Sequence, residues 1–234
     1  FVSDEVATVV GDIGEDTCKF GYGGEDSPKH VFSSTAGYLP LDTSIKVKDI
    51  TVNIAGGGGV VSMDVDGAGA GGGAAGRGGR SGRWLVGDLA VSRRRDGVEM
   101  KSPLVDGLLS DWDQVEKLWE HAFEQRLRAV ASERPVLCAE ASWSTAKERR
   151  GLMELMFEKF GVPAMFPAKN AMLSAFSAGR ANALVCDCGH GATSAVPVVD
   201  GFVLNRAVQR GIRGGKWLSQ QAHAHLAVRL FFFF

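Results

Sequence analysis

The stretch Val9–Gly14, with the sequence VVGDIG, recurs in plan about 175 residues later as Leu184–Gly189, with the sequence LVCDCG. Both stretches read apolar, apolar, small, Asp, any residue, Gly, and each precedes a second run of strand-forming residues. For the first stretch we expect a strand over Val6–Val10, turn residues over Gly11–Gly14 and a returning strand over Thr17–Tyr22. Two strand–turn–strand units of one design predict a duplicated domain with two similar lobes.

An Asp-x-Gly turn between strands has the chemistry that phosphate binding requires. Its glycine lets the backbone approach a ligand closely, and the neighbouring N–H groups form an anion-binding concavity. Asp12 and Asp187 would hold a hydrated divalent cation, and the ammonium of Lys19 would reach phosphate oxygens. One such turn is a weak signal, because hairpins use it everywhere. Two turns in matching context predict a clamp for a di- or triphosphate.

Helical and strand patterns alternate along the rest of the chain. Apolar residues at helical spacing predict helices over Trp112–Leu127, Leu152–Phe160 and Ala171–Ala178. Ser110 and Ser144 are the candidate N-caps of the first two helices. Strands interleaved with helices place the chain in the α/β class.

The composition excludes several classes of protein. The chain has 234 residues with 26 Lys+Arg against 27 Asp+Glu, so no bulk polycation is present to coat nucleic acid. Hydrophobic residues make up 45% of the chain, which is ordinary for a globular protein. No apolar run approaches the roughly 18 residues that a membrane span needs, so we expect no membrane partner.

A glycine-rich segment interrupts the first half of the chain. Thirteen of the 31 glycines fall between Ala55 and Gly82. Such a composition cannot bury enough apolar surface to offset its ordering entropy, so we expect disorder over about 55–83. Arg77, Arg80 and Arg83 resemble an RNA-binding tract, but three arginines are few and a solvated linker is the preferred interpretation. A Gly/Arg-tethered RNA-binding protein is therefore the least favoured function.

Two other patterns have structural interpretations. Cys186, Cys188 and His190 suggest metal ligands, but structural zinc usually needs a second pair of ligands, which the sequence does not supply. Trp112 and Trp119, seven residues apart, are interpreted as a core stripe of a helix and not as a platform on which bases stack.

Several longer motifs resemble the amino-terminal half of actin and its relatives. They are DEV (4–6), DIG (12–14), GYGGEDSP (21–28), SPLVDGLLSDWD (102–113), MFEKFGVPA (156–164) and DCG (187–189). Four others, MDVD (63–66), SDWD (110–113), WEHAF (119–123) and AKN (168–170), are similar to the nuclear class of actin-related proteins, in its green-plant form, rather than to cytoskeletal actin. The resemblance covers residues 4–218 apart from the glycine-rich insert.

This resemblance implies an actin-like ATPase fold with duplicated βββαβα-type lobes and a site for ATP and Mg²⁺, to which Gly215 also contributes. Residues 1–33 and 84–178 would form the first lobe, 34–83 a loop region like the second subdomain of actin, and 179–234 the beginning of a second lobe that stops short. It further implies a structural subunit of chromatin-remodelling and histone-acetyltransferase complexes in the nucleus. The expected partners are actin, a helical scaffold segment of a remodelling ATPase or acetyltransferase subunit and, indirectly, chromatin.

The sequence keeps the family's phosphate-clamp residues and departs from its hydrolytic residues. Asn170 stands where the family has a water-positioning glutamine, and His190 where it has an aspartate that helps activate water. Glu15 replaces a serine for the γ-phosphate, and a carboxylate there repels a polyphosphate unless a metal bridges the two. We expect binding without appreciable turnover, because hydrolysis depends on sub-ångström placement of water. The alternative is an ATP-hydrolysing actin-fold protein, cytoskeletal or chaperone-like. The retained clamp residues are Asp12, Gly14, Lys19, Asp187, Gly189 and Gly191, with Asp12 and Asp187 holding Mg²⁺ through phosphates or water.

Overall fold

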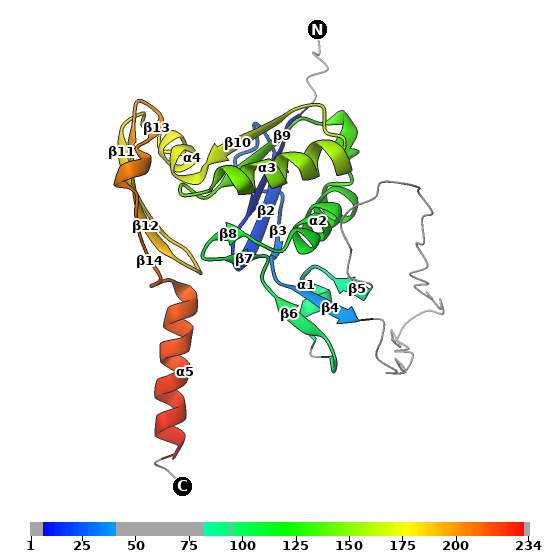
Figure 1. Cartoon of the computed structure of the whole chain (residues 1–234), viewed down its shortest axis with the longest axis vertical. Helices are drawn as coiled ribbons and strands as arrows, with labels where there is room; N and C mark the ends of the chain where they lie inside the picture. The colour runs from blue at the N-terminus through cyan, green and yellow to red at the C-terminus, as the bar shows by residue number, and fades with distance from the viewer. Residues whose placement is uncertain (1–6, 41–81, 94, 232–234) are drawn as a thin grey trace.

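A mixed five-stranded sheet forms the centre of the first lobe (Figure 1). The computed structural model describes residues 7–40, 82–93 and 95–231. The strand order is β10-β9-β1-β2-β3, in which β1, β9 and β10 run parallel and β1, β2 and β3 antiparallel. The strands are β1 (Val9–Ile13), β2 (Thr17–Tyr22), β3 (His30–Ser33), β9 (Val136–Glu140) and β10 (Met165–Lys169). The α/β class predicted from the sequence is confirmed.

Two helices of this lobe begin at side-chain caps. In α2 (Trp112–Glu120), which continues as a π-helical turn over His121–Leu127, the Asp111 carboxylate accepts from the backbone N–H of Gln114. In α3 (Ala146–Glu154), continued by a π-helical turn over Leu155–Lys159, Thr145 and Glu148 form a reciprocal capping box. The predicted caps Ser110 and Ser144 were each wrong by one residue. Ser110 Oγ donates instead to the carbonyl of Pro103, which closes the loop before the helix.

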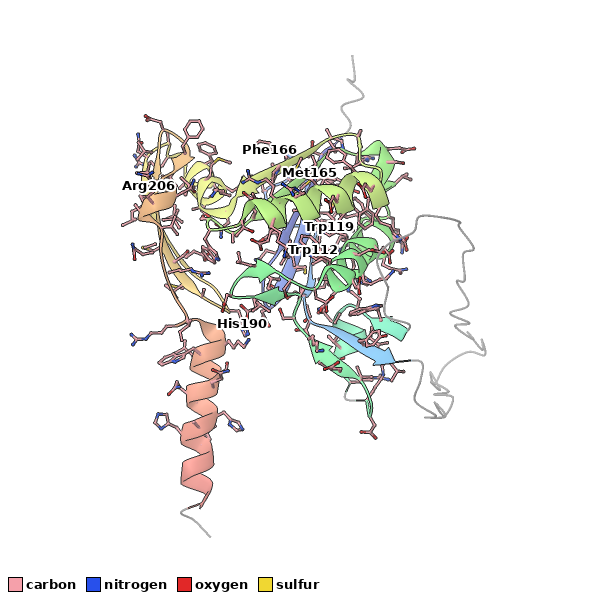
Figure 2. The ribbon with its side chains drawn as sticks, viewed as in Figure 1. Trp112, Trp119, Met165, Phe166, His190 and Arg206 are labelled. Atoms are coloured by element: carbon pink, nitrogen blue, oxygen red, sulfur yellow. The ribbon has the colours of Figure 1, made fainter. Side chains whose placement is uncertain are left out.

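The core of the first lobe lies between the sheet and these helices. Trp119 is 1% exposed and contacts Phe20 edge to face, with ring centroids 4.8 Å apart. A Cβ at Gly11 would overlap the Trp119 indole, which explains why the strand has its small residue there. Trp112 packs against the edge of the same cluster, so the predicted tryptophan stripe is confirmed (Figure 2).

A smaller sheet and a hairpin extend from this lobe. The sheet has the order β5-β4-β6, with β4 (Ala36–Pro40), β5 (Gly82–Leu85) and β6 (Glu99–Lys101). The short helix α1 (Asp88–Val91) follows β5, and β7 (Leu104–Val105) pairs with β8 (Leu108–Leu109). Residues 55–81 of the predicted disordered insert lie outside the described residues. Its last two residues, Gly82 and Arg83, belong to β5, which pairs with β4.

The second lobe has its own sheet and its own small core. Its strands are β11 (Ala183–Cys188), β12 (Thr193–Val199), β13 (Phe202–Val203) and β14 (Gln209–Gly211), with β12 pairing to the other three. Helix α4 (Asn170–Ser177) lies between the two sheets, and its Ala171 and Ala175 pack on Val196 and Val198 of β12. Short 3₁₀ turns occupy Ala131–Glu133 and Asn205–Ala207, and α5 (Gly215–Phe231) leads away from the lobe (Figure 1). In the described part of the chain no helix is long and apolar enough to cross a membrane.

Candidate phosphate-binding site between two hairpins

The β1–β2 and β11–β12 hairpins have the same register. Asp12 pairs with Lys19 in the first, and Asp187 pairs with Ser194 in the second, seven residues on in each case. Each turn closes with the same backbone bond, from Gly14 N to the Thr17 carbonyl at 3.1 Å and from Gly189 N to the Ala192 carbonyl at 2.9 Å. The sequence-based prediction of an internal repeat therefore holds at the level of individual hydrogen bonds.

The first turn lies later in the chain than the sequence suggested. We expected turn residues over Gly11–Gly14, but β1 continues to Ile13 and the turn runs from Gly14 to Thr17. The reason is a long-range contact, because β1 also pairs in parallel with β9, where Gly11 lies opposite Cys138. As a result, the Asp12 carboxylate projects from the end of a strand whose backbone is fixed on both sides.

The polar side chains of the first hairpin are open to solvent. Lys19 Nζ lies 3.5 Å from Asp12 Oδ2, and the two side chains are 48% and 44% exposed. A charge pair this exposed contributes little to stability, so both groups are free to exchange partners with a ligand. Cys18, which lies between them in the chain, is completely buried, and this burial raises the pKa of its thiol.

The start of α5 closes the second hairpin. Gly215 N donates to the Gly189 carbonyl at 3.0 Å, and Lys216 N donates to the His190 carbonyl at 2.8 Å. A Cβ at Gly214 would lie 2.5 Å from the His190 carbonyl oxygen, so this close approach requires glycine. Figure 2 shows His190 at this junction. Gly215, predicted from the resemblance, thus lies against the second turn, while Gly214 was missed although the Gly-Gly pair before a helix was a visible signal.

The two turns face each other across the lobes. The Glu15 carboxylate of the first turn reaches Gly191 of the second, where an added Cβ would overlap it. Glu15 Oε1 also lies 3.1 Å from Lys216 Nζ, and the Glu15 side chain is only 9% exposed. Ser102 Oγ donates to the Glu15 carbonyl at 3.1 Å and holds its backbone. We call the space between the turns Gly14–Thr17 and Gly189–Ala192 the phosphate cradle.

Asn170 lies at the start of α4, where its side chain has a structural role. Its Oδ1 accepts from Ser142 Oγ and from the backbone N–H of Ala171, both at 2.8 Å. The neighbouring Lys169 Nζ donates to the Ser142 carbonyl and to Asn205 Oδ1, both at 2.7 Å, and burial lowers the pKa of this lysine. The amide oxygen of Asn170 is therefore held by the junction between β10 and α4.

A third contact between the lobes was not predicted from the sequence. The Arg210 guanidinium lies 5.4 Å from the centre of the Trp143 ring and donates to the Asp106 carbonyl at 3.2 Å. Trp143 Nε1 donates to the same carbonyl, also at 3.2 Å. Asp106 has a positive φ of 54° in the tight turn of the β7–β8 hairpin, which aims this carbonyl at both donors.

The residues of the cradle fit a phosphate chain accompanied by a divalent cation. Glycines occupy both turns, Lys19 supplies an ammonium, and the carboxylates of Asp12 and Asp187 lie at the strand ends, Asp187 being exposed. Within the described ranges no three His, Cys, Asp or Glu side chains cluster as a metal site. That Mg²⁺ is held here through phosphate oxygens and water stays a prediction, and the Glu15 carboxylate competes with a phosphate chain for space beside Gly191.

Two lobes that each carry an Asp-x-Gly hairpin, with the turns of the two hairpins facing each other, are the arrangement of actin-fold proteins. The family model described as Actin matches residues 3–231, and the chain belongs to the actin family.

Relatives with a more specific name are also similar to this chain. Actin-related protein 4 of Arabidopsis thaliana is 42% identical over 216 residues, which cover 92% of this chain and 47% of the relative. Actin-related protein 4 of Oryza sativa subsp. indica is 40% identical over 220 residues, again 92% of this chain and 47% of the relative. Actin-related protein 4 of Yarrowia lipolytica is 34% identical over 226 residues, 97% of this chain and 46% of the relative. The chain thus spans about half the length of these relatives, corresponding to the amino-terminal half of the family.

Proposed function

We propose that this protein is a nuclear, ATP-binding structural subunit of chromatin-remodelling and histone-acetyltransferase complexes that hydrolyses little or no ATP. The observation that carries the proposal is the combination found at the cradle. Both hairpins are formed and their turns face each other, whereas the resemblance places Asn170 and His190 at the family's hydrolytic positions. The similarity to proteins named actin-related protein 4 supports the nuclear assignment.

Each residue of the cradle has a defined task in this proposal. Lys19 exchanges its exposed contact with Asp12 for phosphate oxygens, which makes a charge-assisted hydrogen bond. Asp12 and Asp187 orient the water shell of Mg²⁺, and bound Mg²⁺-ATP supplies the polyphosphate that links the two hairpins. Asn170 keeps its amide oxygen on Ser142 and the start of α4, so it is poorly placed to orient an attacking water.

The proposed partners are actin and a helical scaffold segment of a remodelling ATPase or acetyltransferase subunit, with chromatin contacted indirectly. Affinity purification of the endogenous protein from nuclear extract, followed by mass spectrometry, tests this assembly. We expect recovery of actin together with a remodelling ATPase or an acetyltransferase scaffold. Recovery with cytoskeletal proteins only, or from cytoplasm and not from nuclei, would contradict the proposal.

Removing the Lys19 charge is expected to weaken nucleotide binding. A charge-assisted hydrogen bond is worth about 1.5–3 kcal/mol, so Lys19→Met should raise the dissociation constant for Mg²⁺-ADP and Mg²⁺-ATP by about 10- to 100-fold. Isothermal titration calorimetry of the purified protein measures this change.

The matched control for Lys19→Met is Lys29→Met. Lys29 lies over the Tyr22 ring, with its Nζ 5.1 Å from the ring centre, and it forms no part of either turn. Its loss should leave both dissociation constants within about twofold of the parent value. Equal effects of the two substitutions would show that Lys19 is not a phosphate ligand.

The retained clamp favours one alternative, an ATP-hydrolysing member of the actin fold, cytoskeletal or chaperone-like. A steady-state turnover rate typical of a true ATPase in the unmodified protein would support this alternative and remove the non-enzyme part of the proposal. Two of the three arginines on which the RNA-binding alternative depends, Arg77 and Arg80, lie outside the described part of the chain.

A further inference from the structure

The phosphate cradle already holds an anionic group that belongs to the protein. The carboxylate of Glu15 lies against Gly191, at the place where a Cβ would otherwise fit, and is almost completely buried. Its counter-ion is Lys216, at the start of α5 in the other lobe, 201 residues away in the chain. In this position the Glu15 side chain does what a bound phosphoryl group would do, because it links the two turns through a negative charge.

We propose that Glu15 is a specificity-determining residue that makes the cradle bind a nucleoside diphosphate more tightly than the corresponding triphosphate. The inference rests on the proposed function, since it concerns the same nucleotide site. It deepens that function by naming which phosphate chain the site retains.

The first argument is space. A phosphoryl group is tetrahedral with three terminal oxygens and is larger than a planar carboxylate with two, so it cannot share the place beside Gly191 that the Glu15 carboxylate already occupies. The opening beside Gly191 exists only because this residue has no Cβ, and Glu15 fills it. A phosphate chain that is one phosphoryl group shorter shares the cradle with this side chain, whereas the longer chain must displace it.

The second argument is charge. Mg²⁺-ATP carries one more negative charge than Mg²⁺-ADP, and the Glu15 carboxylate, whose side chain is only 9% exposed, repels that additional charge. Lys216 Nζ is already 3.1 Å from Glu15 Oε1, so its charge is shared with the carboxylate before any ligand arrives. Displacing Glu15 towards solvent also breaks this ion pair and leaves Lys216 to be compensated by the ligand. The charge repulsion and the loss of the ion pair both weaken the binding of the triphosphate.

The third argument is the rigidity of the Glu15 backbone. Its carbonyl accepts from Ser102 Oγ, and the turn around it is closed by the bond from Gly14 N to the Thr17 carbonyl. The Glu15 carboxylate can therefore leave the cradle only by rotation of its side chain, which a diphosphate does not require.

Calorimetric titration with Mg²⁺-ADP, Mg²⁺-ATP and the non-hydrolysable β,γ-imido analogue of ATP tests the inference. For the unmodified protein we expect the dissociation constant for Mg²⁺-ADP to be at least about tenfold lower than that for either triphosphate, equivalent to about 1.4 kcal/mol.

Glu15→Gln keeps the shape of the side chain and removes its charge, and should reduce the ratio of the triphosphate to the diphosphate dissociation constant. Glu15→Ser removes both and should abolish the preference.

Glu99→Gln is the matched control. Glu99 is an exposed carboxylate paired with Lys101 in β6, and its substitution should leave the ratio unchanged. Equal affinity of the unmodified protein for the di- and triphosphate overturns the inference without any variant, and so does a preference that survives Glu15→Ser. Failure of every nucleotide to bind the unmodified protein and Glu15→Ser alike would instead overturn the nucleotide-binding function itself.

Discussion

Replacing Trp119 with alanine is expected to lower the free energy of unfolding by about 3–5 kcal/mol, the range for a large aromatic side chain removed from a core. Trp119 is 1% exposed and contacts the rings of both Phe20 and Phe123, at centroid distances of 4.8 Å and 5.5 Å. Gly11 lies directly against its indole, so the cavity would open beside β1, the strand that ends in Asp12. Urea denaturation followed by circular dichroism measures the loss.

The control for this prediction is Phe157→Ala, which removes an aromatic side chain that is 43% exposed. It should cost less than about 1 kcal/mol, because partly exposed side chains lose less contact on truncation. The prediction would be contradicted if Trp119→Ala cost no more than this control.

The sequence was sufficient for the features that depend on local pattern. The two hairpins of one design, the tryptophan stripe and the end of the helix before Gly179 were all predicted, because periodicity and turn residues specify them. The helix caps were displaced by one residue, since the polar side chains of Ser110 and Asp111 compete and only packing decides between them. The first turn was misplaced because the parallel pairing of β1 with β9 joins residues more than 120 positions apart.

The features that the sequence could not specify are those that depend on how the lobes meet. Glu15 was recognised as a departure from the family, but its partner Lys216 is a single lysine near a helix start, and nothing local links the two. The same holds for Arg210 and Trp143, which are brought together only by the placement of β14 beside the β7–β8 hairpin. Such pairs leave no periodic signal in the sequence, so they can be recognised only in the three-dimensional structure.

Polar contacts connect the two lobes in addition to the apolar packing of α4 on β12. Most of the buried apolar residues of the described chain fall into two clusters, one under the five-stranded sheet and one under α4. Between the lobes lie the ion pair of Glu15 with Lys216, the hydrogen bond of Lys169 with Asn205 and the contacts of Arg210. Polar contacts of this kind are individually weak and respond to charge, so a bound polyphosphate would change the balance that sets the position of the lobes.

Restoring the family's hydrolytic residues should convert the protein from a binder into an ATPase. The double variant Asn170→Gln/His190→Asp is expected to raise ATP turnover by on the order of 100-fold, within the range that positioned acid–base groups contribute. Gln at position 170 reaches one methylene further than Asn, whose oxygen is held by Ser142 and Ala171. Asp at position 190 leaves intact the backbone carbonyl that accepts from Lys216 N. Release of inorganic phosphate at saturating Mg²⁺-ATP measures the rate.

The matched control is Asn182→Gln/His225→Asp, which makes the same two exchanges at exposed positions away from the cradle. It should leave turnover at the parent level, while thermal melts confirm that both double variants fold.

The hydrolytic variant should also be made together with Glu15→Ser, because displacement of the Glu15 carboxylate opposes binding of the triphosphate. A rise only in that triple variant would show that Glu15 limits hydrolysis by keeping the terminal phosphate out. No rise in either background would mean that the separation of the turns, and not the identity of residues 170 and 190, limits ATP hydrolysis.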